Sequence, residues 1–298
     1  MTGEAAHAPG TSGAIGADGA NPTGAATALR LDQALVERGL VRSRNRAARE
    51  IDAGRVRVNG TVVRKPAFRV PPEAVLVLED EDPWVARSAH KLLGALTDLP
   101  GPAERLADAV CLDAGASTGG FTQVLLARGA AHVYAVDVGH DQLAAELRSD
   151  SRVTNLEGHN LRALHPAWIA PHTGVDLVVA DVSFISLTHF TDRLLGIVRP
   201  GGELLLMVKP QFELARSALD KHGVVTSPVR RAEAVAHVAR DLTSRGGEIL
   251  GWAPSRLPGP TGNREYFLHV RRPRGGVVSD PATDLVARMT ESIGRESA

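Results

Sequence analysis

The chain has 298 residues, and 43% of them are apolar, so it can bury the core of one large domain or of two smaller ones. Its 34 basic and 34 acidic residues give a net charge of zero, which alone indicates no attraction to nucleic acid. The single cysteine, Cys111, excludes an intramolecular disulfide, and no apolar run reaches the roughly 20 residues that a membrane span needs. With no secretory signal pattern at the N-terminus, a cytoplasmic protein is expected.

The charge is distributed unevenly along the chain. Residues 1–28 contain nine alanines and six glycines but no lysine or arginine, which is typical of a disordered tail. Residues 29–79 contain eleven basic and six acidic residues, a net charge of +5, whereas residues 80–298 have a net charge of −3. This asymmetry predicts a small module for an anionic partner beside a nearly neutral body.

The basic segment is predicted to form a small α+β domain. Two short helices are expected on either side of Gly39, the second with Ser43 as its N-cap. A hairpin is predicted over residues 55–63, because Asn59-Gly60 favours a tight turn between two alternating strands. The amides at the start of the second helix favour anions, and several arginines gather there. The candidate phosphate ligands are Arg42, Arg44, Arg46, Arg49 and Arg55.

A solvated helix face is the alternative explanation for these arginines, since arginine is common on protein surfaces. However, three motifs of the segment resemble the RNA-binding domain of ribosomal protein S4 and its relatives. They are Arg30-Leu-Asp-Gln-Ala-Leu35, Ser43-Arg-Asn-Arg-Ala-Ala48 and Gly54-Arg-Val-Arg-Val-Asn-Gly60. The resemblance implies that this domain binds structured RNA, largely through shape and phosphate contacts.

After a linker at residues 80–88, apolar strands alternate with helical segments. Strands are expected at 109–113, 132–137, 175–181 and 203–208, and helices at 121–128, 142–148, 185–198 and 229–245. Two further strands, 248–252 and 265–270, should form an antiparallel pair. The pattern predicts a Rossmann-like α/β domain of the class I methyltransferase type over residues 89–272. Residues 273–298 are expected to be a C-terminal tail, in which 280–293 can fold as a short amphipathic helix that packs on the domain or frays rather than inserting in a bilayer.

A glycine-rich turn, residues 113–121, follows the first strand, and Asp137 ends the second, where it can bind ribose hydroxyls. Ser117 replaces the middle glycine with which a dinucleotide fingerprint approaches a pyrophosphate. S-adenosylmethionine, which has a ribose but no phosphate, is therefore the expected cofactor, and a plain structural turn is the alternative. The candidate cofactor residues are Asp113, Gly115, Ser117, Gly119, Asp137 and, following a third strand, Asn160.

Asp181 and Lys209 directly follow the fourth and fifth strands, at the sheet edge where ligands of such folds bind. Strand capping is the alternative role for either residue. Amino-group methylation is not indicated, because the sequence after the fourth strand is Asp181-Val-Ser-Phe184 without the prolines typical of that chemistry.

Five ordered motifs make residues 29–272 similar to the TlyA family, in which an S4-like domain precedes an FtsJ-like ribose methyltransferase domain. They are Trp84-Val-Ala-Arg-Ser-Ala-His-Lys-Leu92, Asp113-Ala-Gly-Ala-Ser-Thr-Gly-Gly-Phe121, Ala180-Asp-Val-Ser-Phe-Ile-Ser186, Val208-Lys-Pro-Gln-Phe-Glu213 and Gly259-Pro-Thr-Gly-Asn-Arg-Glu-Tyr-Phe267. The resemblance implies methylation of cytidine ribose 2′-hydroxyls in ribosomal RNA. The chain departs from the family in one motif, with Ala86-Arg-Ser-Ala89 where Ser-Arg-Gly-Gly is more usual.

The family's catalytic tetrad falls on Lys91, Asp181, Lys209 and Glu265. A ribose hydroxyl is a weak nucleophile, so a lysine that takes or orients its proton suits the reaction. We expect Lys209 in that role, held by Asp181, with Lys91 and Glu265 directing the nucleotide. For Lys91 taken alone, a solvated helix lysine is the alternative.

Two other functions remain open on the sequence: a non-catalytic RNA-binding factor in ribosome assembly, and a haemolysin, as the family is often labelled. His90, His159 and His222 have no metal-ligand spacing with Cys111, so no metal is expected. A ribosomal partner, no membrane partner and a monomeric chain are expected. The sequence determines neither the modified nucleotide nor the ribosomal subunit.

Overall fold

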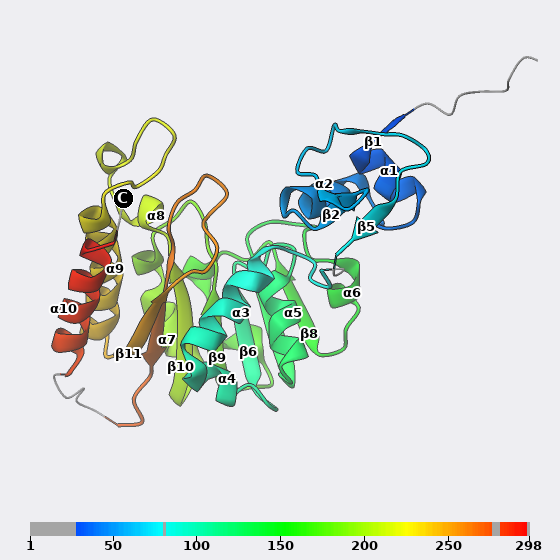
Figure 1. The fold of residues 1–298 in the computed structure, drawn as a ribbon. Coiled ribbons are helices and arrows are strands. Elements are labelled where there is room, and N and C mark those ends of the chain that lie inside the picture. Colours follow the sequence, from blue (N-terminus) through cyan, green and yellow to red (C-terminus); the bar gives the residue numbers. More distant parts are fainter. Residues whose placement is uncertain (1–27, 80–81, 276–280, 297–298) are drawn as a thin grey trace, which may run out of the picture. The chain divides into compact units, whose positions relative to one another are not determined.

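The computed structural model describes residues 28–79, 82–275 and 281–296, which divide into two compact units between Pro83 and Trp84 (Figure 1). The predicted N-terminal tail lies outside the described residues, apart from Ala28, and so do Asp80 and Glu81 of the predicted linker. No helix of the described ranges is long and apolar enough to cross a membrane.

The first unit contains two helices and two small sheets. Its elements are β1 (Leu29–Arg30), α1 (Leu31–Glu37), α2 (Arg44–Asp52), β2 (Val56–Val58), β3 (Thr61–Val62), β4 (Arg69–Val70) and β5 (Leu76–Leu78). As predicted, the Ser43 side chain caps α2 by accepting the Arg46 amide. The predicted hairpin is also confirmed: β2 and β3 pair across Asn59 and Gly60, which both have positive φ.

The second unit is an α/β domain. Its helices are α3 (Ser88–Asp98), α4 (Pro100–Glu104), α5 (Gly120–Ala127), α6 (Ala145–Arg148), α7 (Thr191–Ile197), α8 (Pro210–Glu213), α9 (Pro228–Ser244) and α10 (Pro281–Gly294). Its strands are β6 (Val110–Ala114), β7 (His132–Asp137), β8 (Val153–Glu157), β9 (Val175–Ala180), β10 (Val198–Val208), β11 (Glu248–Pro254) and β12 (Tyr266–Arg271). Short 3-10 helices lie at Leu161–Ala163, Pro166–Ile169, Leu187–His189 and Arg216–Ala218.

The seven strands form one sheet in the order β11-β12-β10-β9-β6-β7-β8. Five neighbouring strands are parallel, and β12 runs antiparallel to both β10 and β11, so the predicted antiparallel final pair is confirmed. The chain moves outward from β6 to β7 and β8 and then crosses back to β9. The carboxyl ends of β6 and β9 therefore form the switch point at which ligands of such sheets bind.

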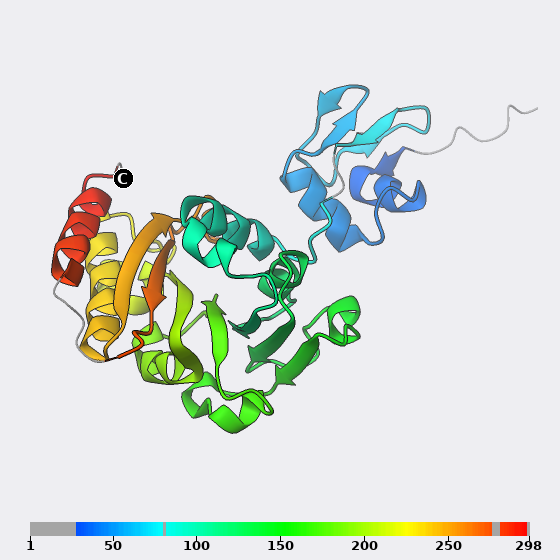
Figure 2. The same cartoon turned by 90° about the horizontal axis from the view of Figure 1, so that it is seen from below.

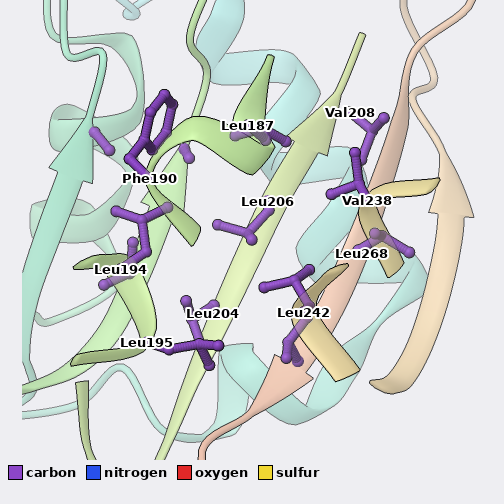
Figure 3. Packing of buried hydrophobic residues seen from close by; sticks show 14 of the residues in the cluster. Leu187, Phe190, Leu194, Leu195, Leu204, Leu206, Val208, Val238, Leu242 and Leu268 are labelled. Atoms are coloured by element: carbon purple, nitrogen blue, oxygen red, sulfur yellow. The ribbon is translucent and has the colours of Figure 1, made fainter. Parts of the chain in front are cut away.

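Helices cover both faces of this sheet (Figure 2). Along β10, Leu204, Leu206 and Val208 contribute to one apolar cluster with α7, α9 and α10, whereas Leu205 and Met207 contribute to the other with α3 and α5. Figure 3 shows the first three of these side chains packed against the helical leucines. Since successive residues of a strand point to opposite faces, a continuous apolar run is what a strand buried on both sides requires.

Two predicted helices are shorter in the structure, for identifiable reasons. The helix expected over 142–148 starts only at Ala145, because the Gln142 and Leu143 amides donate to the Glu157 carboxylate. The segment 185–198 is divided into a 3-10 turn and α7, and its last residue, Val198, starts β10. The C-terminal helix is confirmed as α10, and it packs on the domain through Met289, which is fully buried.

Candidate active site at the carboxyl edge of the sheet

The four predicted catalytic side chains come from distant segments and are joined in two ion pairs at one edge of the sheet. Asp181 follows β9 and Lys209 follows β10. Glu265 immediately precedes β12, whose first residue, Tyr266, pairs with Val208 at the end of β10. The strand register therefore brings Glu265 to the same edge as Lys209.

The first ion pair joins the ends of β9 and β10. Lys209 Nζ lies 2.6 Å from Asp181 Oδ1 and donates a hydrogen bond to Ser183 Oγ at 2.7 Å. An ammonium group has three N–H donors. Among the described residues Ser183 accepts one of them, and the contact with Asp181 is an ion pair without hydrogen-bond geometry. At least one N–H position of Lys209 is therefore available to a further group.

The second ion pair joins α3 to the start of β12. Lys91 Nζ donates to Glu265 Oε2 at 2.5 Å, and the two side chains are 8% and 1% exposed. The alternative of a solvated helix lysine is therefore wrong for Lys91. Charges this deeply buried are stable only when they are paired, so each residue of this pair needs the other.

The glycine-rich turn after β6 adopts backbone conformations that side chains rarely tolerate. Gly115, Ser117 and Gly119 all have positive φ. A Cβ on Gly119 would lie 2.3 Å from a Leu147 methyl carbon, and one on Gly115 would lie 2.9 Å from the Asp181 carbonyl oxygen. At Gly115 the turn thus approaches the backbone of Asp181, directly after β9, so closely that only glycine fits there, and at Gly119 the positive φ itself favours glycine.

Asp113, at the end of β6, stabilises this turn through hydrogen bonds to Thr122 in α5. Its side chain is fully buried, and its Oδ2 accepts hydrogen bonds from the Thr122 amide and hydroxyl at 2.9 and 2.7 Å. Burial raises the pKa of Asp113 to about 7, because the charged form is desolvated. Its Oδ1 is buried without a hydrogen-bond partner among the described residues. Asp113 thus fixes the start of α5, and its direct contact with a cofactor stays a prediction.

Asp137 is held in position by two backbone amides. Its Oδ2 accepts from the Ser117 amide at 2.8 Å and its Oδ1 from the Gly139 amide at 2.7 Å. A carboxylate has about four acceptor positions, so about two remain for hydroxyl groups. Asn160, by contrast, uses its side-chain oxygen to cap a 3-10 turn at the Arg162 amide, although the residue is exposed.

Two aromatic rings that were not predicted as site residues lie in the segments that follow Asp181 and Lys209. Phe184 is 90% exposed and has a φ of 66°, an uncommon backbone state for so large a residue. Its ring centroid lies 5.2 Å from that of Phe212, in α8. Their position in the motifs around Asp181 and Lys209 is the signal that could have identified them.

The predicted RNA-binding arginines fall into two groups in the first unit. Arg46 and Arg55 pair with the buried carboxylate of Glu50, and their side chains are only 17% and 27% exposed. Arg42 and Arg49 are exposed, and Arg44 is 56% exposed although it pairs with Asp32. Hydrogen bonds, first from Arg30 and then from Arg44, lower the pKa of this aspartate to about 2. Arg46 and Arg55 therefore also stabilise the fold.

We predict that Arg46→Ala and Arg55→Ala each lower the free energy of unfolding of the first unit by about 2 kcal/mol, since each weakens the pairing of a buried carboxylate. Arg42→Ala is the matched control and should change it by less than about 0.5 kcal/mol, because this side chain is exposed. Thermal unfolding of the full chain followed by circular dichroism measures both effects. Equal midpoints for Arg46→Ala and Arg42→Ala would contradict the structural role.

Comparisons with known proteins match the two units of the chain, which divide between Pro83 and Trp84, to two different families. The family model described as FtsJ-like methyltransferase matches residues 84–272, and the S4 domain model matches residues 29–76. The "16S/23S rRNA (cytidine-2'-O)-methyltransferase TlyA" of Mycobacterium tuberculosis is 50% identical over 244 residues, which cover 81% of this chain and 89% of that protein.

Two further relatives extend the comparison. YqxC of Bacillus subtilis, provisionally named an rRNA methyltransferase, is 37% identical over 83% of this chain and 87% of its own length. A solved structure from Streptococcus thermophilus, provisionally described as a haemolysin, is 32% identical with a TM-score of 0.66, over 89% of this chain and 96% of its own.

Proposed function

This chain belongs to the TlyA family of FtsJ-like methyltransferases, and from that membership we propose that it methylates the ribose 2′-hydroxyl of cytidine in ribosomal RNA, with S-adenosylmethionine as methyl donor. One observation of the structure carries the assignment to this site. Lys91, Asp181, Lys209 and Glu265, which lie up to 174 residues apart in sequence, form two ion pairs at the ligand-binding edge of the sheet.

The residues around the turn after β6 fit S-adenosylmethionine. The close approach of Gly115 and Gly119 to their neighbours gives the turn a fixed shape, and the free acceptor positions of Asp137 suit the two hydroxyls of a ribose. The start of α5 offers amide donors to the methionine carboxylate. We assign cofactor binding to Gly115, Ser117, Gly119 and Asp137, with Asn160 at the rim.

Catalysis then depends on how the chain's own residues hold the ribose hydroxyl. The bound cofactor supplies an electrophilic methyl group on sulfur. The available N–H position of Lys209 orients the 2′-hydroxyl, and Asp181 and Ser183 fix the lysine amine. In its neutral amine form Lys209 would take the proton of the hydroxyl as the methyl group is transferred, whereas in its ammonium form it would orient the hydroxyl and the proton would pass to water. Alignment of oxygen, carbon and sulfur supplies much of the acceleration.

The RNA substrate is recognised by both units in this proposal. The exposed arginines of the first unit contact phosphates of folded RNA. In the second unit, the exposed ring of Phe184 lies in the same loop as Ser183, the hydrogen-bond acceptor of Lys209. Proteins that modify a nucleotide within folded RNA hold its unstacked base against aromatic rings, and Phe184 suits that contact.

We expect the purified chain to transfer labelled methyl groups from S-adenosylmethionine to ribosomal RNA, because the lysine and cofactor residues of the site are all present. Mapping 2′-O-methyl groups on RNA from cells with and without the chain should show at least one cytidine that depends on it. Failure of transfer on all ribosomal substrates, with no site lost from the cells, would return the assignment to an assembly factor. Leakage of lipid vesicles exposed to the same preparation would favour the haemolysin.

A further inference from the structure

A carboxylate in α8 joins the two loops that carry the Lys209–Asp181 ion pair. Glu213 lies four residues after Lys209, and its Oε1 accepts the Leu187 amide at 2.9 Å. Its Oε2 accepts the Ser186 hydroxyl at 2.5 Å. Both acceptors thus bind the segment that follows Asp181. Burial raises the pKa of Glu213, in keeping with its partly enclosed position.

The loop after Asp181 requires such a support. Phe184 combines a left-handed backbone with an almost fully exposed side chain, a strained state that persists only where the surroundings impose it. Its exposed ring can contribute little burial to offset that strain. The chain is fixed again at Ser186, whose Oγ also accepts the Thr188 amide at the start of a 3-10 turn.

Among the described residues, four links therefore connect the loop after β9 to Lys209 and α8. They are the Lys209–Asp181 ion pair, the Lys209–Ser183 hydrogen bond, the contact between the Phe184 and Phe212 rings, and the two hydrogen bonds of Glu213. The two links of Lys209 carry the proposed chemistry, and the aromatic contact involves an exposed ring. Glu213 supplies the remaining link, and α8, which begins directly after Lys209, packs against the long helix α9.

We propose that Glu213 is a positioning residue. It holds the loop after β9, which begins at Asp181, beside Lys209, and so determines where the Lys209 amine lies relative to the ribose hydroxyl. Both carboxylate oxygens of Glu213 bind residues of the loop after β9, so the role proposed for Glu213 is to position that loop. The inference rests on the proposed methyl transfer for its catalytic part, and on the loop contacts alone for its structural part.

The test compares Glu213→Ala with Glu213→Gln in the full chain. Alanine removes both hydrogen bonds. It should lower kcat about 10- to 100-fold, because small displacements near reacting groups have effects of that size. KM for S-adenosylmethionine should stay within about twofold of the wild-type value. Glutamine can still accept the Leu187 amide and bond Ser186, so it should restore kcat to within about threefold. Glu233→Ala, which removes a half-exposed carboxylate of α9 that pairs only with Arg230 among the described residues, is the matched control and should leave kcat unchanged.

Hydrogen exchange supplies a readout that does not depend on activity. Amides of residues 183–189 should exchange faster in Glu213→Ala, whereas amides within α9 should not. Ser186→Ala removes one of the two Glu213 bonds together with the cap on the Thr188 amide, and it leaves the Leu187 bond to Glu213 in place. Exchange of residues 183–185, outside that cap, should rise less than in Glu213→Ala, which keeps the test usable if Glu213→Ala folds poorly.

Wild-type kcat in Glu213→Ala, or unchanged exchange of the loop, would overturn the inference. An inactive wild-type chain would instead refute the proposed function, and exchange alone would then decide whether Glu213 holds the loop.

Discussion

Lys209→Ala should lower the rate of methyl transfer by about 10²- to 10⁴-fold, the usual contribution of a positioned proton-handling group, while S-adenosylmethionine binding stays close to that of the wild type. The expected separation follows from the structure, because the cofactor residues lie after β6, at the end of β7 and after β8, whereas Lys209 follows β10. Single-turnover methyl transfer and calorimetric titration of the cofactor measure the two effects. Lys221→Ala, which changes an exposed lysine, is the matched control.

The arginine variant distinguishes the two roles proposed for Lys209. Arginine keeps the positive charge and can pair with Asp181, but it does not lose a proton in proteins. Activity of Lys209→Arg within about tenfold of the wild type would identify an orienting cation, whereas activity as low as that of the alanine variant would identify a proton acceptor. Lys209→Ala with normal cofactor binding and undiminished transfer would refute both roles.

Asp137→Ala provides the contrasting result. Loss of its carboxylate should weaken cofactor binding, because the acceptor positions proposed for the ribose are removed. Lys91→Ala is a poorer test, since it leaves the buried Glu265 carboxylate without its ion-pair partner and lowers stability as well as activity.

Local patterns predicted the elements whose signals are contained within a few residues. The Asn59-Gly60 turn and the Ser43 cap depend on neighbouring residues alone. The strands β6, β7, β9 and β10 were predicted because burial on both faces demands continuous apolar runs. The edge strand β8 has no such run. Polar residues interrupt its apolar ones and the strand is only partly buried, so hydropathy did not delimit it.

The site was predictable to the extent that chain order and family motifs determine it. Residues that follow parallel strands must share an edge, and this brought Asp181 and Lys209 together. The pairing of Lys91 with Glu265 depends on α3 packing beside β12's end, a tertiary contact that no spacing rule encodes. The Ser183 acceptor and the Glu213 link were missed for the same reason.

Deleting residues 29–79 should weaken binding to ribosomal RNA by roughly 10²-fold or more and flatten its salt dependence, with cofactor affinity nearly unchanged, because this segment carries a net charge of +5. The deletion is reasonable because the first unit has its own apolar core, separate from the two clusters of the second. Filter binding of RNA over a range of salt concentrations gives the slopes for both proteins.

A full-length variant separates lost charge from a lost domain. Arg42→Gln combined with Arg44→Gln removes two exposed cations and leaves the buried Glu50 cluster intact, so the salt slope should fall by about two if each contacts one phosphate. Arg128→Gln in the second unit, an exposed arginine at the end of α5, is the matched control. The zero net charge of the whole chain conceals this arrangement, since the charge of +5 on the basic module is offset by −3 on the body and −2 on residues 1–28. Equal slopes for the deleted and complete chains would show that the second unit, despite its negative charge, supplies the phosphate contacts.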